Sequence, residues 1–326
     1  MRRRRTAAPV GVGVTGAGTP LGRALLERLP DALTVDTQSL EGLRTVLHLA
    51  VSYDVAEDPD ARRSRTVRGT AALLAAARKA GVLRVVLVTG LDVHAGAEPG
   101  SPVPLTEDLP LRADPGSPLT GDLLEVERLA DHATRTGLEV LVLRPAPLVG
   151  GALGPAYDGM LLQSLTGPRL LAVRGVEPLW QLCHSDDLLS ALELAATSDL
   201  TGTAAVASDG WLTQREVEGL SGQRRVELPA SVALSTAERL HRAGVTRGSP
   251  AELDRLLAPL VVEPRRLREA GWTPAWTTRD ALVAHLASRP VAGGRAGAYT
   301  AAGAGATVAL VGTAALVRRA RRRRGR

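Results

Sequence analysis

A glycine-rich turn between an apolar run and a helical pattern constrains this chain more than any other feature. Residues 10–15 read VGVGVT, an apolar, β-branched run without polar alternation, which predicts a strand buried on both faces. Gly16, Gly18 and Gly22 follow at once, and leucines then recur at helical spacing between residues 23 and 29. Because the N-terminus of a helix offers unpaired N–H groups and a positive dipole, this turn predicts a phosphate-binding site.

Apolar runs of the same kind recur through the first half of the chain and alternate with helical stretches. The predicted strands are residues 33–36, 45–50, 83–89 and 138–144, and the predicted helices are residues 67–80 and 119–136. Strands that alternate with helices of this length form βαβ units around a parallel sheet. The sequence therefore predicts an α/β fold, a Rossmann-like doubly wound parallel sheet with a small C-terminal lobe.

An acidic residue stands where a dinucleotide-binding turn needs one. Asp36 ends the second predicted strand, twenty residues after Gly16, and can accept hydrogen bonds from ribose hydroxyls. Its charge repels a 2′-phosphate, so NAD is favoured over NADP. The residues that we expect to contact the cofactor are Thr15, Gly16, Gly18, Thr19, Leu21, Gly22, Asp36, Leu49 and Ala50.

The pattern loosens from about residue 150, where glycine and proline become frequent. Further helices are predicted at residues 186–196, 214–220, 265–270 and 279–287. We therefore divide the chain into four parts. They are a basic N-terminal arm (1–9), an NAD(P)-binding domain (10–150), the remaining sheet elements with a substrate-binding lobe (151–289), and an Ala/Gly-rich linker with an arginine-rich tail (290–326).

The net charge of +6 is concentrated at the two ends of the chain. Eleven of the 40 lysines and arginines stand in residues 2–5 and 318–326, and the other 29 are outnumbered by 34 acidic residues. The body of the chain is thus mildly acidic, and with 2% aromatic residues it predicts no specific nucleic-acid partner. One cysteine and six scattered histidines predict no metal site.

Residues 298–317 form an uncharged stretch that is long enough to span a bilayer. Eight alanines, three glycines and three threonines give it little hydrophobic drive, and spanning would export the seven arginines that follow. With no signal peptide recognised, we expect a cytoplasmic protein. Contact of the arginine tail with an anionic membrane remains an alternative.

Six short motifs in order resemble the extended short-chain dehydrogenase/reductases, in the NAD-dependent epimerase/dehydratase group. The resemblance covers residues 10–287 and rests on TGAGTPLG at 15–22, VLHLA at 46–50, VRGT at 67–70, LRP at 143–145, HSDDL at 184–188 and GWTP at 271–274. It implies a bound NAD, a small-molecule substrate such as a nucleotide-sugar, and a homodimer. The substrate itself is not specified by the sequence.

The chain departs from this family where proton transfer takes place. The family's Tyr-x-x-x-Lys pair falls on Leu119 and Leu123, and the only lysine, Lys79, belongs to another predicted helix. The serine or threonine that orients substrate would fall near Gly90, with Thr89 as the nearest hydroxyl. The usual apparatus for acid–base work is therefore absent from these positions.

Two further departures concern the cofactor region. Nine residues separate Asp36 from Val46, which is too few for the helix, strand and helix that the family carries there. We therefore expect the edge strand of the sheet to be missing and the adenine site to have fewer walls. The middle glycine of the turn also stands at 18, while Thr19 occupies the family's position for it.

Several polar residues remain as weak catalytic candidates. Thr89, Asp92 and His94 end or follow the strand at 83–89, where ligands bind in such folds, although solvated loop residues are the favoured interpretation for Asp92 and His94. Tyr53 and Tyr157 also follow predicted strands, and either could replace the lost phenol.

His184 with Asp186 and Asp187 could form a metal or acid–base cluster. We favour a helix N-terminus in which Ser185 is the cap and the two acids complement the dipole.

Three functional hypotheses follow. The first is an NAD(P)-binding oxidoreductase or sugar-nucleotide-modifying protein of the epimerase/dehydratase type. The second is a catalytically silent dinucleotide-binding sensor or partner subunit. The third is a membrane-associated accessory protein that docks through its tail.

Overall fold

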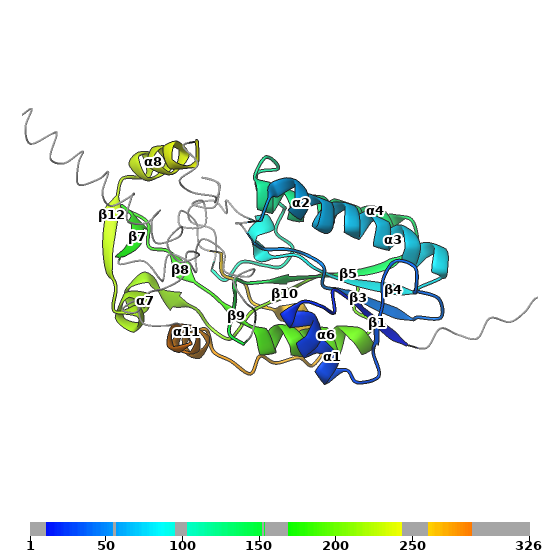
Figure 1. Cartoon of the computed structure of the whole chain (residues 1–326). Coiled ribbons are helices and arrows are strands. Elements are labelled where there is room, and N and C mark those ends of the chain that lie inside the picture. Colours follow the sequence, from blue (N-terminus) through cyan, green and yellow to red (C-terminus); the bar gives the residue numbers. More distant parts are fainter. Residues whose placement is uncertain are drawn as a thin grey trace, which may run out of the picture.

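A six-stranded parallel sheet is the centre of the structure (Figure 1). The computed structural model describes residues 11–54, 57–94, 103–151, 153, 169–242 and 260–288. The sheet has the order β10-β5-β4-β3-β1-β2. Its strands are β1 (Val12–Thr15), β2 (Leu33–Thr34), β3 (Thr45–His48), β4 (Arg84–Val88), β5 (Glu139–Pro145) and β10 (Gly202–Val206). This confirms the predicted Rossmann-like, doubly wound α/β fold.

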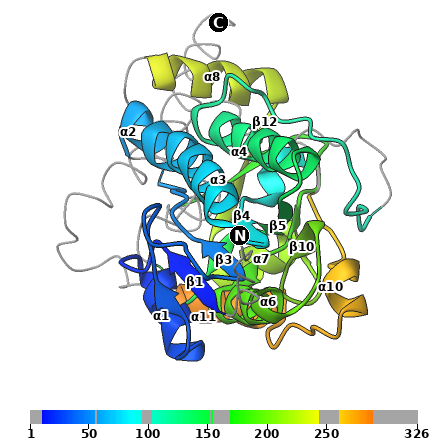
Figure 2. The same cartoon turned by 90° about the vertical axis from the view of Figure 1, so that its right-hand side faces the viewer.

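Helices cover both faces of the sheet (Figure 2). One layer holds α1 (Pro20–Arg28) and α6 (Ser185–Thr197), and the other holds α3 (Gly69–Ala80) and α4 (Pro118–Arg135). Because side chains alternate along a strand, Val86 and Val88 of β4 join the core under α1 and α6, while Val85 and Leu87 join the core under α3 and α4. Burial on both faces explains why these strands read as continuous apolar runs.

The chain reverses direction across the sheet between β1 and β3. From β1 it passes through α1 to β2 on one side, and it then returns to β3 on the other side of β1. Ligands of doubly wound sheets bind beyond the carboxyl ends of the strands at such a switch point. Here that place is formed by residues 15–22 after β1 and 49–54 after β3.

The sheet ends at β2, a two-residue strand with Leu33 58% exposed. Residues 37–44 form turns, so no strand stands beyond β2 in the described residues. The expectation that the family's edge strand is missing is confirmed.

The opposite edge, β10, is covered by side chains. The buried carboxylate of Glu107 accepts hydrogen bonds from the N–H of Ala205 at 2.8 Å and the N–H of Arg266 at 2.9 Å. The guanidinium of Arg266 donates to the carbonyls of Thr201 and Thr203. Arg266 lies in α10 (Arg265–Glu269), so these bonds attach that helix to the strand and pair the free backbone groups of the edge.

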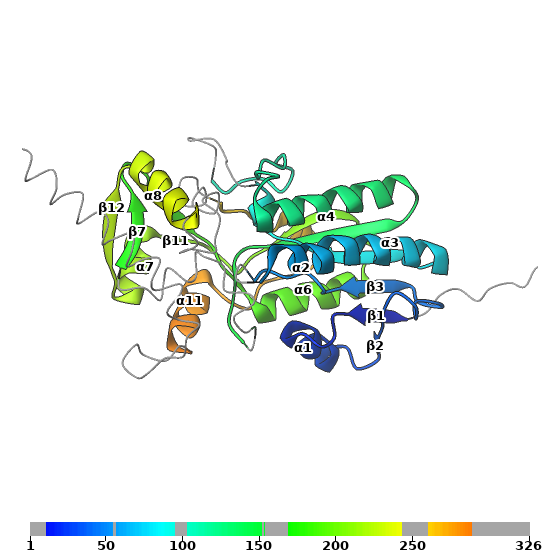
Figure 3. The same ribbon diagram turned by 45° about the horizontal axis from the view of Figure 1, so that its top comes forward.

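A smaller lobe packs beyond the carboxyl ends of the strands (Figure 3). Its elements are β7 (Arg169–Val173), β8 (Leu179–Trp180), β11 (Leu212–Thr213), α7 (Gln214–Ser221), β12 (Arg224–Leu228), α8 (Ala230–Arg242) and α11 (Thr278–Ala287). β7 pairs with β12, β8 pairs with β11, and β6 (Leu148–Val149) pairs with β9 (Cys183–His184). Trp180, Leu212 and Leu282 belong to its apolar core.

The predicted helix at 67–80 is part of a longer helical segment. α2 (Pro59–Arg63) runs into a π-helical turn, η1 (Ser64–Arg68), and then into α3. Sequence periodicity missed the first part because the extra residue of a π turn breaks the spacing of 3.6 residues. α1 also begins earlier than predicted, at Pro20, whose ring suits the first turn of a helix.

No helix in the described residues is long and apolar enough to cross a membrane. Residues 298–317 and the arginine tail lie outside the described residues.

The cover of the β10 edge generates the first prediction. In the Glu107→Gln variant, an amide –NH₂ group replaces one of the two carboxylate oxygens. Each of these oxygens accepts from a backbone N–H, so one of the two N–H groups loses its acceptor. We expect the free energy of unfolding to fall by about 1–3 kcal/mol in urea titrations. The exposed neighbour is the control, since Asp108→Asn should change it by less than about 0.5 kcal/mol. Equal stability of the two variants would contradict the role of Glu107.

The second prediction concerns the buried imidazole of His48. Thr70 Oγ donates to Thr66 O, so it accepts from His48 Nε2–H, and Nδ1 accepts from Thr15 Oγ at 2.6 Å. Burial lowers the pKa of His48 from 6.5 to about 4. The unfolded chain therefore binds the proton first, and stability falls as pH drops below the unfolded pKa. Between about pH 7 and 5 we expect a loss of about 2 kcal/mol from this residue.

The test compares urea unfolding of three proteins across that pH range. His48→Gln should have a shallower pH dependence than the parent. The matched control is His132→Gln, which makes the same change at an exposed histidine. An unchanged slope in His48→Gln would refute the assignment.

Candidate functional site

Two glycines allow the turn after β1 to pack against the rest of the site. Gly16 has φ +73°, and a Cβ on it would lie 2.8 Å from the carbonyl carbon of Leu49 and 3.0 Å from the nitrogen of Ala50. A Cβ on Gly22 would lie 2.3 Å from Gly16 O. Neither position therefore has room for a side chain. Because glycine has no Cβ, β1, α1 and the end of β3 can pack closely together. The structure thus places Leu49 and Ala50 beside Gly16.

Thr19 is the N-cap of α1 in place of the family's glycine. Its hydroxyl donates to Gly16 O at 2.8 Å and accepts from Gly22 N–H at 3.0 Å. Gly18 faces open space within the described part of the chain, since a Cβ there would meet none of its atoms within 4 Å. Arg23 Nη1 donates to Gly18 O at 2.6 Å, which places a cation next to the turn. The shift of the middle glycine to position 18 thus leaves the turn intact, and Thr19 caps the N-terminus of α1.

Asp36 follows β2 and is exposed at the same edge of the sheet. Its Oδ1 accepts from Gln38 N–H at 2.8 Å and from Ser39 Oγ at 3.0 Å. These hydrogen bonds lower the pKa of Asp36, so it is ionised at neutral pH. In the described part of the chain no hydrogen bond reaches Oδ2, which can accept from a ribose hydroxyl.

These features together fit a dinucleotide. The turn between Gly16 and Gly22 offers the helix N-terminus, Arg23 adds positive charge beside it, and Asp36 offers a fixed carboxylate. Leu21 is buried, and its N–H belongs to the first helical turn, where no intrahelical partner exists. Pyrophosphate and ribose can thus both be held by residues after β1 and β2.

The positions of the family's proton-transfer groups form an apolar surface. Leu119 and Leu123 lie on the first turns of α4 and are buried. A Cβ on Gly90 would lie 3.8 Å from Leu123 Cδ1 and 3.5 Å from Asp92 Oδ2. Leu123 packs in a cluster with Val51, Val93, Ala113 and Leu124. The structure therefore brings positions 90 and 123 together, and neither carries a group that can move a proton.

Tyr53 reaches this apolar surface from the segment after β3. Its ring packs against the Leu123 cluster, and its hydroxyl donates to the carbonyl of Thr89. The phenol thus lies at the end of β4, although its proton is directed at the backbone. Tyr157, the other phenol considered, lies outside the described residues.

Thr89 and His94 belong to a buried ion-pair network that the sequence analysis missed. Glu127 of α4 and Arg144 of β5 form a two-point pair, with Nε–Oε1 and Nη2–Oε2 distances of 2.9 Å. Thr89 Oγ donates to Glu127 Oε1 at 2.7 Å, and Arg144 Nη1 donates to His94 Nε2 at 3.1 Å. The sequence signal that could have identified Glu127 was its spacing from Leu119 and Leu123, which places all three residues on one helix face.

The network determines the protonation state of His94. Arginine has no acceptor, so His94 Nε2 must accept, and the ring carries its proton on Nδ1 toward Pro110 O. Burial first, and then the charge of Arg144, lower the pKa of His94. The expectation that His94 is a solvated loop residue is wrong, because the 3-10 turn η2 (Leu91–His94) directs it into the interior. Asp92, on the same turn, is partly exposed.

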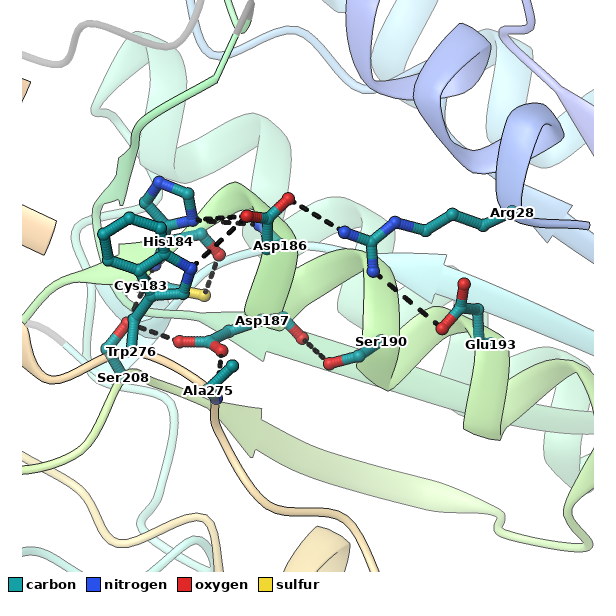
Figure 4. A network of polar contacts seen from close by, with 10 residues as sticks. All are labelled: Arg28, Cys183, His184, Asp186, Asp187, Ser190, Glu193, Ser208, Ala275 and Trp276. Carbon is teal, nitrogen blue, oxygen red and sulfur yellow. Dashed lines mark hydrogen bonds and ion pairs between the residues drawn. The ribbon is translucent and has the colours of Figure 1, made fainter. Parts of the chain in front are cut away.

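The HSDDL motif joins the sheet to the lobe (Figure 4). Asp187 is fully buried, and its two oxygens accept from Ser208 Oγ at 2.7 Å and from Ala275 N–H at 2.7 Å. Asp186 pairs with Arg28 of α1 at 2.8 Å and accepts from Trp276 Nε1. These partners come from α1, from the loop after β10 and from the turn before α11. The role of the motif is therefore structural.

His184, rather than Ser185, is the N-cap of α6. Its Nδ1 accepts from Asp186 N–H at 3.2 Å, and its ring stacks on Trp276 with centroids 3.7 Å apart. Ser185 is already helical, which corrects the predicted cap. A Cβ on Gly150 would lie 2.0 Å from His184 Nε2, so glycine is required where β6 passes the ring. In the described residues no group of three histidine, cysteine or acidic side chains is placed to hold a metal.

Comparison with known proteins gives relatives of this architecture. An uncharacterized protein of Mycobacterium tuberculosis is 32% identical over 252 residues, which are 75% of this chain and 65% of that protein. A 3-diazoavenalumate denitrifying reductase from Streptomyces sp is 32% identical over 161 residues, covering 47% of this chain and 51% of that protein. This chain therefore matches less than two thirds of the length of these relatives.

Solved structures share the fold at low sequence identity. A dTDP-glucose 4,6-dehydratase from Streptomyces venezuelae with NAD bound aligns with a TM-score of 0.62 at 19% identity, covering 85% of this chain and 96% of that one. A UDP-glucose 4-epimerase from Thermus thermophilus in complex with NAD aligns with a TM-score of 0.61 at 20% identity, covering 85% and 98%. At these identities the likeness shows the fold alone.

The family model for the NAD dependent epimerase/dehydratase family matches residues 12–206. That range contains the turn at Gly16–Gly22, Asp36 and the whole parallel sheet. NAD is the cofactor of this family. The chain belongs to the NAD dependent epimerase/dehydratase family.

Proposed function

We propose that this chain is an NAD-dependent oxidoreductase that works without the family's tyrosine and lysine. The turn carries the proposal, because Gly16 and Gly22 leave no room for a side chain while Gly18 faces open space. A turn kept only for packing has no need of an open glycine followed by a capped helix N-terminus. The pyrophosphate would lie against the first turn of α1, near Leu21 N–H and Arg23, with a ribose at Asp36.

The bound nicotinamide would supply or accept a hydride, and this chain's residues would hold and orient it. Thr89 and Tyr53, at the ends of β4 and β3, lie near the apolar surface of Gly90, Leu119 and Leu123. This surface supports orientation and exclusion of water, but the residues at positions 90, 119 and 123 themselves offer no acid or base. The nucleotide-sugar chemistry named for the solved neighbours is therefore less well supported than reduction of another substrate, as named for the Streptomyces reductase.

A second candidate is a catalytically silent dinucleotide-binding sensor or partner subunit. The observation that favours it is the same apolar surface, where three positions of the proton-transfer apparatus carry no polar side chain. The two candidates share the cofactor site and differ in whether a bound reduced cofactor is consumed.

The proposed cofactor site is tested by calorimetric titration of the full chain with NADH and with NADPH. We expect NADH to bind, and NADPH to bind at least about tenfold more weakly, because Asp36 repels the 2′-phosphate. Asp36→Ala should weaken NADH about tenfold, since the ribose hydroxyls lose their acceptor. Arg23→Ala should weaken both nucleotides by a similar factor, because both carry the pyrophosphate.

A matched control uses a charged residue away from the turn. Arg78, in the last turn of α3, is exposed, and Arg78→Ala should leave both affinities unchanged. If neither nucleotide binds the parent protein, both candidates fail. If NADH binds but is not oxidised with any acceptor tested, the second candidate, a catalytically silent dinucleotide-binding protein, is supported.

A further inference from the structure

The segment between Asp36 and β3 turns back into the protein almost at once. Residues 37–39 are exposed, and the side chains of Leu40 and Leu43 that follow are 2% and 4% exposed. Both leucines belong to the core under α3 and α4. Because β2 is the last strand of the sheet (Figure 3), a three-residue turn is what the chain places beyond Asp36 at this edge.

The polar groups of this turn hold Asp36 in place. Asp36 Oδ1 accepts from Gln38 N–H at 2.8 Å and from Ser39 Oγ at 3.0 Å. Ser39 Oγ in turn accepts from Asp36 N–H at 3.0 Å, so its proton and one lone pair are used inside the turn. The other two side chains, those of Thr37 and Gln38, are exposed. Hydrogen bonds from exposed, flexible side chains compete with water and contribute little to affinity.

The segment after β3 offers the base of a bound dinucleotide little more. Val51 and Ser52 are buried, and Ala50 is half-buried. The Tyr53 hydroxyl donates to the carbonyl of Thr89 at the end of β4, three strands from β2. The side-chain contact that residues 50–53 leave for a ligand near β2 is therefore the methyl group of Ala50.

We propose that this site selects the pyrophosphate and the ribose of its cofactor and does not select the base of the second nucleotide. A purine beyond Asp36 meets the exposed turn at 37–39 and water, so dinucleotides with adenine or with another purine bind with similar affinity. The inference rests on the proposed NAD-dependent function. It assigns recognition to the turn at Gly16–Gly22, to Arg23 and to Asp36.

Hypoxanthine is the purine that tests this inference most sharply. It carries a carbonyl oxygen where adenine has its amino group, and an N1–H where adenine has an unprotonated N1. A site that hydrogen-bonds the adenine edge meets two groups of the wrong kind, and its unpaired buried partners reject such an analogue strongly. A site in which the base faces water loses nothing on the exchange, because water pairs with either edge.

The experiment titrates the full chain with NADH and with reduced nicotinamide hypoxanthine dinucleotide by calorimetry. We expect the two dissociation constants to agree within about threefold. Asp36→Ala should weaken both nucleotides by the same factor, because the carboxylate contacts the ribose that they share. A preference of the parent protein for NADH greater than about threefold would overturn the inference.

The matched control is Gln38→Ala. This change removes the amide side chain from the turn and keeps the backbone N–H from which Asp36 accepts. The ratio of the two dissociation constants should stay the same. A ratio that changes by more than about threefold would show that Gln38 reads the base, which equally overturns the inference.

A second readout follows the base directly. In saturation-transfer NMR of NADH with the full chain, the adenine protons should receive less saturation than the nicotinamide protons, because they lie farther from the protein. Equal or stronger saturation of the adenine protons would contradict the inference.

The same titrations separate this inference from the function on which it rests. If NADH binds and the hypoxanthine dinucleotide does not, the cofactor site stands and the inference is wrong. If neither dinucleotide binds, the proposed function fails and the inference fails with it.

Discussion

The close approach of the turn after β1 to the end of β3 is the constraint on which the other parts of the structure depend. A Cβ on Gly22 would lie 2.3 Å from Gly16 O, and a Cβ on Gly16 would lie 2.8 Å from the backbone of Leu49. Side chains at either glycine would separate α1 from the sheet. Since α1 also carries Arg28, which pairs with Asp186 of α6, that separation would reach the helix layer and the lobe behind it. The proposed cofactor site and the packing of the domain thus have the same steric origin.

Buried polar side chains connect elements that lie far apart in the sequence. His48 connects Thr15 of β1 with Thr70 of α3, and it can do so only in the neutral form. Glu127 and Arg144 connect α4 with β5, and Asp187 connects α6 with residues 208 and 275. Each of these groups is buried with partners for its oxygens or nitrogens, which is what makes charge tolerable in an interior.

The sequence was sufficient for the sheet, the order of its elements and the glycine turn after β1, because those depend on local signals. Apolar runs, glycine spacing and the nine-residue gap after Asp36 all act within about twenty residues of each other. It was insufficient for His94 and for the cap of α6. His94 contacts Arg144, fifty residues away, and the ring of His184, the N-cap of α6, stacks on Trp276. Contacts between residues so far apart in the sequence produce no periodic pattern of residue types in it.

The apolar surface of Gly90, Leu119 and Leu123 and the charged network next to it are best understood together. α4 would ordinarily need its first turns for catalysis, yet here Leu119 and Leu123 pack, while Glu127 one turn later remains fixed by Arg144 and Thr89. The packing of α4 on the sheet therefore does not depend on the tyrosine and lysine that the family carries at these positions.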